Sequence, residues 1–314
     1  MKLVLAFLKL IRVPNLFFIG LTQVLFHFCI ILPIFKKGAA EPVFNNFYLL
    51  LLILSSILIA AAGYIINDYF DINIDQINKP QKNVVDKIIS RRWAMLWHSL
   101  FSFFAVATGF YIGWKLNVFW LGLLFFFCSV LLFFYSTTFK KKLLSGNLII
   151  SILTAWSVSV LGLATFYIVL KNPDAYTTME NSKILRFTIL YGAFAFIISL
   201  IREAIKDMED LPGDAKYGCR TMPIVWGINA TKIYTAVWLC VLICAMLIIQ
   251  VYLLQYKWWW PVLYSIVFIT SICLHILRNL FKAAVPFDFH RLSNQSKMVM
   301  LTGILSMLFF YYYL

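Results

Sequence analysis

Long apolar segments separated by short polar ones make up most of this chain. Residues 47–66 contain no charged side chain, and several other runs are about as long. A helix that crosses a membrane needs about 20 mainly apolar residues. Membrane β-barrels show short alternating segments instead, and these runs do not alternate. The pattern therefore predicts an all-α polytopic membrane protein.

Nine spans fit the pattern, and we expect them to form a single transmembrane domain over residues 1–314. The expected limits are 14–35, 47–66, 94–114, 117–139, 147–170, 186–205, 233–255, 258–279 and 297–314. The third and fourth spans are so close that a tight hairpin around Trp114 to Val118 must join them.

Composition supports this interpretation and removes one class of function. The chain is 62% hydrophobic and only 13% charged, whereas soluble domains carry about 25% charged residues. The net charge of +14 could suggest a nucleic-acid partner. No nucleic-acid motif is present, however, and basic loops beside membrane spans are explained by topology and lipid headgroups. We therefore expect a lipid bilayer as partner and no nucleic acid.

The loop charges predict an orientation. Twenty of the 27 Lys and Arg residues fall on the side of the expected N-terminus and seven on the other side. The positive-inside rule then places the N-terminus in the cytoplasm. We expect the protein to reside in the cytoplasmic membrane. Ten of the 13 acidic residues lie on that same side. Acids contribute little to orientation, so this bias needs another cause.

Two acidic motifs supply that cause. NDYFDINID contains Asp68, Asp71 and Asp75, and KDMEDLPGD contains Asp207, Asp210 and Asp214, both with the spacing i, i+3, i+7. Such positions share one face of a helix, where like charges repel each other. A bound cation would relieve that repulsion, and Mg²⁺ typically takes one or two carboxylates together with phosphate oxygens and water. We therefore expect all six aspartates to be metal ligands around a diphosphate, with Asp214 on a loop because Pro212 and Gly213 precede it.

Basic residues accompany both motifs. Lys82 follows the first, Lys140 lies at the same membrane edge, and Arg202, Lys206, Lys216 and Arg220 flank the second. Cations interleaved with metal-binding acids suit a Mg²⁺–diphosphate ligand. The four histidines have no metal-ligand spacing and are expected to be packing or interfacial residues.

At these residues the chain resembles the UbiA superfamily of intramembrane prenyltransferases. NDYFDINID is similar to the family's NDxxDxxxD motif, and KDMEDLPGD to its DxxDxxxD motif. KYGCRTMP, YSTTFKKKLLSGN and IRVPN resemble three further family segments. The similarity runs from about residue 9 to 230. Lys82 stands where the family often has Arg, and a lysine meets a phosphate without the bidentate geometry of arginine.

The resemblance implies helices around a central cavity that opens to lipid, and Mg²⁺-dependent transfer of a prenyl group from a polyprenyl diphosphate. Asp71, Asp75, Asp207 and Asp210 would act in catalysis, and Tyr135 would stabilise the allylic cation or simply pack. The residues implied in diphosphate or acceptor binding are Asn15, Asn67, Lys82, Lys140, Arg202, Lys206, Lys216 and Arg220.

The acceptor stays open at this point. The superfamily uses quinone-precursor, haem, chlorin and glycerophosphate acceptors. IREAIKDMEDLPGD looks most like the geranylgeranylglycerol-phosphate geranylgeranyltransferases and their bacterial relatives. The number of cations near the second motif favours an anionic acceptor, with Arg220 as its expected partner. Two other functions remain: a secondary transporter whose acids bind coupling ions, and an inactive relative that binds lipid.

Overall fold

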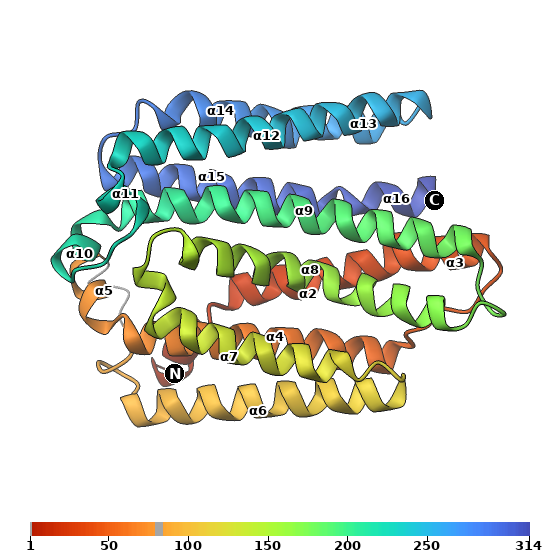
Figure 1. Ribbon diagram of the computed structural model, residues 1–314, viewed down its shortest axis with the longest axis horizontal. Coiled ribbons are helices and arrows are strands. Elements are labelled where there is room, and N and C mark those ends of the chain that lie inside the picture. The colour runs from red at the N-terminus through yellow and green to blue at the C-terminus, as the bar shows by residue number, and fades with distance from the viewer. Residues whose placement is uncertain (1, 79–83) are drawn as a thin grey trace.

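A computed structural model describes residues 2–78 and 84–314. Within these residues the chain is helical apart from its loops and an isolated bridge between Val85 and Ile89. The long helices run side by side along the longest axis of the molecule (Figure 1). They are α2 (Val13–Phe26), α4 (Asn46–Phe70), α6 (Arg91–Lys115), α7 (Trp120–Thr137), α8 (Ser145–Lys171), α9 (Thr178–Glu209), α12 (Ile228–Gln255) and α15 (Pro286–Leu305).

Two long segments continue through a wider π-helical turn. His27–Ile31 joins α2 to α3 (Leu32–Lys37), and Ile266–Thr270 joins α13 (Trp259–Ser265) to α14 (Ser271–Leu280). With these continuations, eight helical segments among the described residues are long and apolar enough to cross a membrane. They coincide with the first eight expected spans, which confirms a multi-pass membrane protein. The α6–α7 connection is the expected tight hairpin.

The ninth expected span differs from its sequence limits. Its helix begins at Pro286 rather than at residue 297, and Ser306 separates α15 from α16 (Met307–Tyr313). The additional turns contain Asp288, His290 and Arg291, so hydropathy alone could not assign them to a span. The segment nevertheless packs in the bundle, against α9 and α2.

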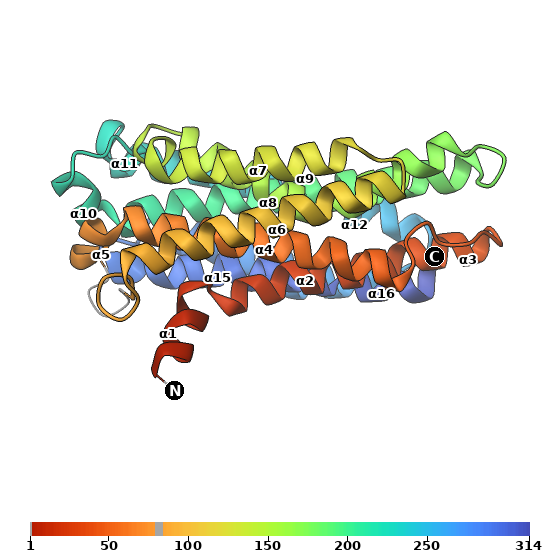
Figure 2. The same cartoon turned by 90° about the horizontal axis from the view of Figure 1, so that it is seen from below.

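Six helices form a closed ring. In order around the ring, α2 packs on α4, α4 on α7, α7 on α8, α8 on α9, α9 on α15, and α15 again on α2. Helix α6 lies outside α4 and α7, and α12 and α14 lie outside α9 and α15. The short helices α5 (Ile72–Asn78), α10 (Leu211–Lys216) and α11 (Met222–Val225) gather at one end of the bundle (Figure 1). Near that end, α1 (Lys2–Leu10) projects away from the body of the molecule (Figure 2).

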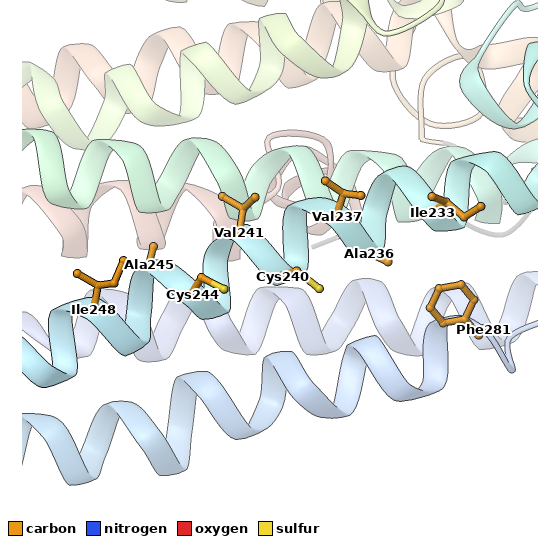
Figure 3. Close-up of a pocket in the computed structure, with 9 residues that line it drawn as sticks. All are labelled: Ile233, Ala236, Val237, Cys240, Val241, Cys244, Ala245, Ile248 and Phe281. Carbon is orange, nitrogen blue, oxygen red and sulfur yellow. The ribbon is translucent and has the colours of Figure 1, made fainter.

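The outer surface suits a lipid environment. A shallow groove follows α12 from Ile233 to Ile248 and reaches Phe281 beyond the end of α14 (Figure 3). Its lining is entirely apolar apart from the thiols of Cys240 and Cys244. In water such a surface would be costly, whereas against acyl chains it costs little.

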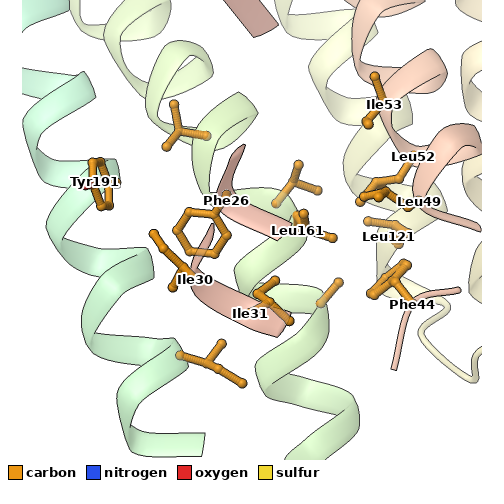
Figure 4. Packing of buried hydrophobic residues seen from close by; sticks show 14 of the residues in the cluster. Phe26, Ile30, Ile31, Phe44, Leu49, Leu52, Ile53, Leu121, Leu161 and Tyr191 are labelled. Carbon is orange, nitrogen blue, oxygen red and sulfur yellow. The ribbon is translucent and has the colours of Figure 1, made fainter. Parts of the chain in front are cut away.

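The interior of the ring is apolar at the end remote from α5 and α10. Phe26, Ile30 and Leu161 belong to a buried cluster there, together with side chains from α4 and α7 (Figure 4). Tyr191 stacks edge-on against Phe26 with ring centroids 6.3 Å apart. This cluster closes one end of the ring and leaves the polar end accessible.

Candidate active site

Both acidic motifs face one cavity at the polar end of the ring. The cavity has a volume of about 700 Å³ and is lined by residues of α2, α4, α7, α8, α9 and α15. All six motif aspartates line it. It also extends past Phe125, Trp156 and Tyr191 toward the apolar cluster. A single cavity therefore combines a carboxylate-rich end with an apolar interior.

The two motifs have nearly the same backbone. Helix α4 ends just before Asp71, whose φ and ψ are −90° and 0°, and α5 follows. Helix α9 ends just before Asp210, whose φ and ψ are −89° and 1°, and α10 follows. In both motifs the amide of the third aspartate donates a hydrogen bond to the carbonyl of the second, at 2.8 Å for Asp75 and 3.1 Å for Asp214. The repeated spacing thus encodes a repeated helix–break–helix unit.

This geometry corrects two sequence-based expectations. The three aspartates of the first motif do not lie on one continuous helix, because the chain breaks at the middle one. Asp214 lies in the short helix α10 rather than on a loop. Pro212 occupies the first turn of α10, where a missing N–H costs little. Proline here starts a helix instead of preventing one.

Cations and amides already hold the first motif in place. A guanidinium nitrogen of Arg12 lies 2.6 Å from an oxygen of Asp68, and Lys140 forms an ion pair with Asp71. The side-chain amide of Asn67 donates to the same Asp71 oxygen at 2.7 Å. Burial alone would lower the pKa of Lys140, but the Asp71 carboxylate raises it above its usual value. Lys140 therefore presents a permanent positive charge at the cavity.

The second motif has a similar surrounding. Asn147 donates to Asp207 at 2.9 Å. One turn earlier on α9, the Glu203 carboxylate forms ion pairs with Arg202 at 2.6 Å and with Lys206 at 3.4 Å. The buried Nε of Arg202 has no hydrogen-bond partner among the described residues. Arg202 itself lines the cavity, and an arginine in that position is suited to bind an anion.

Asn78 links the two motifs directly. It belongs to α5, yet its side-chain amide donates to the backbone carbonyl of Asp210 at 3.0 Å. Its side-chain oxygen accepts from the backbone N–H of Gly213 at 2.8 Å. A Cβ at position 213 would lie 2.5 Å from that amide group. Glycine is therefore required here for close approach, and Asn78 fixes the distance between the motifs.

We expect Asn78→Ala to weaken the apparent Mg²⁺ affinity of the expected prenyl transfer and to lower the free energy of unfolding by about 1–3 kcal/mol, because the Gly213 N–H loses its partner and the Asp210 carbonyl keeps only the bond from Asp214. The measurements are Mg²⁺ titration of prenyl transfer and thermal unfolding in detergent. Asn279→Ala is the matched control, since Asn279 does not line the cavity and its side chain bonds only His275 on its own helix among the described residues. An unchanged Mg²⁺ requirement in Asn78→Ala would show that Asn78 does not position the motifs.

Most of the sequence-predicted site residues lie together. Those that line the cavity are Asn15, Asn67, Asp68, Asp71, Asp75, Tyr135, Lys140, Arg202, Lys206, Asp207, Asp210 and Asp214. Lys82 falls outside the described residues. Lys216 and Arg220 are exposed and do not line the cavity. After α10 the chain reverses at Gly218, whose φ is 68°, and the backbone N–H of Arg220 donates to the carbonyl of Lys141. Because Arg220 does not line the cavity, the expected contact with an acceptor has no support in this geometry.

Several cavity residues were missing from the sequence-based site. They are Arg12, Asn78, Asn147, Glu203, Glu209, His290, Ser293, Asn294 and Lys297. His290 is not isolated, because its Nδ1 lies 2.8 Å from an oxygen of Glu209. The sequence offered one usable signal for His290, Ser293, Asn294 and Lys297. These polar residues follow a helical period just before the expected start of the ninth span.

The donor set fits a metal that arrives together with a phosphate ligand. Among the described residues, no three His, Cys, Asp or Glu side chains are grouped closely enough to hold an ion by themselves. Mg²⁺ does not need such a cage, because it is usually held by one or two carboxylates plus substrate phosphates and waters. Asp71 and Asp75 from one motif, with Asp207 and Asp210 from the other, provide hard oxygen ligands around one cavity.

Comparison with known proteins agrees with this geometry. The chain is 33% identical over 175 residues to digeranylgeranylglyceryl phosphate synthase of Methanothermobacter thermautotrophicus, which covers 56% of this chain and 54% of that protein. It is 27% identical over 267 residues to the enzyme of the same name from Methanosphaera stadtmanae, which covers 83% and 87%. The first match thus spans about half of its relative.

Solved structures show the same fold. A structure described as digeranylgeranylglyceryl phosphate synthase in membranes superimposes with a TM-score of 0.62 at 20% identity, covering 98% of this chain and 99% of that one. A UbiA homologue from Archaeoglobus fulgidus bound to DMAPP and Mg²⁺ gives 0.57 at 17% identity, covering 96% and 98%. The family model of the UbiA prenyltransferases matches residues 38–286. With the paired motifs and the central cavity, this match establishes that the chain belongs to the UbiA prenyltransferase family.

Proposed function

We propose that this protein transfers a prenyl group, with Mg²⁺, from a prenyl diphosphate to the hydroxyl oxygen of an alkylated glyceryl phosphate. The proposal rests on the single cavity between the two acidic motifs, whose backbone conformations are nearly the same. This cavity continues into an apolar interior. A diphosphate with a long apolar tail matches both parts of that cavity. The relatives named digeranylgeranylglyceryl phosphate synthase support the choice of acceptor.

The reaction breaks the bond between the allylic carbon and the diphosphate oxygen, and both electrons leave with the diphosphate. The acceptor oxygen then bonds to that carbon, and its proton passes to the released diphosphate. When bound, Mg²⁺ would neutralise charge on the departing diphosphate. The metal would be held by Asp68, Asp71 and Asp75 on one side and by Asp207, Asp210 and Asp214 on the other.

The protein's own cations would assist diphosphate departure. Lys140 presents a fixed positive charge, and Arg202 lines the same cavity, where its guanidinium would bind a phosphate oxygen. Asn67 and Asn147 orient one carboxylate each. Tyr135 lines the same cavity, and its ring face would stabilise an allylic cation. The apolar lining beyond it would exclude water from that cation.

A secondary transporter is a weaker interpretation. Coupling-ion sites in transporters usually lie near the bilayer midplane, whereas both acidic motifs lie at one end of this bundle, where α4 and α9 end (Figure 1). An inactive lipid-binding relative is also disfavoured, because all six aspartates line the cavity.

We further propose that the acidic end faces the cytoplasm and that the protein resides in the cytoplasmic membrane, as the loop charges indicate. Asn172, at the opposite end after α8, would then face outward. A cysteine at this position is expected to react with a membrane-impermeant maleimide in intact cells, and reaction only after cell lysis would reverse the orientation.

The test of the proposed function is an assay of the purified protein with geranylgeranyl diphosphate and Mg²⁺. Geranylgeranylglyceryl phosphate, hydroxybenzoate and dihydroxynaphthoate are offered together, and products are identified by mass spectrometry. We expect the doubly prenylated glyceryl phosphate as the main product. Prenylation of an aromatic acceptor instead would retain prenyl transfer and reject the glyceryl phosphate. Consumption of no diphosphate with any acceptor would reject the enzyme assignment.

A further inference from the structure

Four polar residues form a strip on the cavity side of α15. They are His290, Ser293, Asn294 and Lys297, and all four line the cavity. Their positions, i, i+3, i+4 and i+7, share one face of a helix. Helix α15 contains neither aspartate motif, and the prenyl-transfer chemistry described above uses none of the four. We call this set the α15 strip.

The strip is a costly feature for a helix in this position. The side chains of Phe289, Leu292 and Val299 on the same helix are buried among apolar neighbours, and the bundle around them is membrane-spanning. A lysine in such a helix is expensive, and it normally faces an aqueous cavity and has a function. Lys297 does face the cavity, whereas Arg291 on α15 is exposed and lies outside the lining.

The strip suits an anion of phosphate size. Side chains three or four residues apart on a helix have Cβ atoms about 5–6 Å apart, so the Lys297 ammonium and the Asn294 amide can contact one ligand. Helical side chains also tilt toward the helix N-terminus, which directs Lys297 toward the polar end of the cavity. At that end Glu209 binds His290. The carboxylate of Glu209 would repel a phosphate, so the favourable position lies at Asn294 and Lys297.

The strip adds a cation from α15 to those that lie beside the aspartate motifs. Around the aspartate motifs, Arg12 is paired with Asp68, Lys140 with Asp71, and both Arg202 and Lys206 with Glu203. These cations lie where a metal–diphosphate ligand would be held. Lys297 enters the cavity from α15, the helix that packs between α9 and α2. Cations therefore line the cavity both beside the motifs and on α15, an arrangement that would suit two anionic groups.

We infer that the α15 strip binds the phosphate of the acceptor, with Lys297 supplying the charge and Asn294 a hydrogen bond. This inference rests on the proposed prenyl transfer to a glyceryl phosphate and deepens it. The acceptor's phosphate would lie at the strip while its free hydroxyl points to the allylic carbon. The strip would thus select acceptors that carry an anionic headgroup.

The test compares Lys297→Gln with Arg291→Gln, which removes an outward-facing cation from the same helix. Steady-state kinetics are measured with geranylgeranyl diphosphate and either geranylgeranylglyceryl phosphate or its phosphate-free counterpart, geranylgeranylglycerol. We expect Lys297→Gln to raise the KM for the phosphate acceptor at least tenfold and to leave the KM for the diphosphate within twofold. With geranylgeranylglycerol, wild type and Lys297→Gln should react alike. Arg291→Gln should match wild type throughout.

Three results would overturn the inference: no change in Lys297→Gln, a rise in KM for the diphosphate alone, or an equal rise for both substrates. Lys297→Arg, which keeps the charge, should restore most of the affinity, and Asn294→Ala gives a second variant if Lys297→Gln does not fold. Binding of geranylgeranylglyceryl phosphate is also measured directly by native mass spectrometry. If wild type binds this lipid and Lys297→Gln does not, the strip is confirmed even where turnover is absent, and only the proposed function fails.

Discussion

Asp71→Ala is expected to lower the rate of prenyl transfer by about 10³-fold or more, in line with the loss of one preorganised charge-stabilising group in an active site. Asp71 is only 2% exposed, lines the cavity and interacts with both Lys140 and Asn67. Its removal takes away a metal ligand and leaves Lys140 without its counter-charge. The measurement is turnover of labelled geranylgeranyl diphosphate by protein that elutes as a single species in detergent.

Two further variants make this result interpretable. Asp174→Ala removes an exposed aspartate from the α8–α9 connection, at the opposite end of the bundle, and should retain full activity. Asp71→Asn keeps the shape of the side chain, and it serves if the alanine variant is unstable. If Asp71→Ala and Asp174→Ala were equally active, the acids of the first motif would be surface charges without a catalytic role.

Removal of the metal should have an even larger effect. In excess EDTA we expect transfer to fall to the uncatalysed background, because six carboxylates around a diphosphate repel it unless divalent ions lie between them. Addition of Mg²⁺ beyond the chelator should restore the rate. The experiment follows product formation by mass spectrometry, with the helical content recorded by circular dichroism as a control for unfolding. Undiminished transfer in EDTA would refute the two-motif metal site.

The sequence was sufficient for those features that are local or periodic. Apolar runs of about twenty residues predict spans because no other structure satisfies the backbone inside a bilayer. The i, i+3, i+7 spacing of Asp68, Asp71 and Asp75 predicted a shared direction, and all three do line the cavity. The break at Asp71 was not predicted, since a helix and a helix–break–helix unit place these carboxylates on similar sides.

Contacts between distant segments could not be predicted in this way. Asn78 and Gly213 are 135 positions apart, and Asn147 and Asp207 are 60 apart. No periodicity in the chain pairs these residues, because the closing of the ring brings them together. The same limit explains Arg220, which is near Asp214 in sequence yet is exposed and does not line the cavity.

The contact between Asn78 and Gly213 has a consequence for how sequences of this family vary. A side chain at position 213 would occupy the space that the Asn78 amide fills, and only a side chain with both a donor and an acceptor at 78 can bond the Asp210 carbonyl and the Gly213 N–H together. The two positions therefore constrain each other and should change together or not at all. In an alignment, this pair should appear as statistically coupled columns that join the N-terminal and C-terminal halves of the protein.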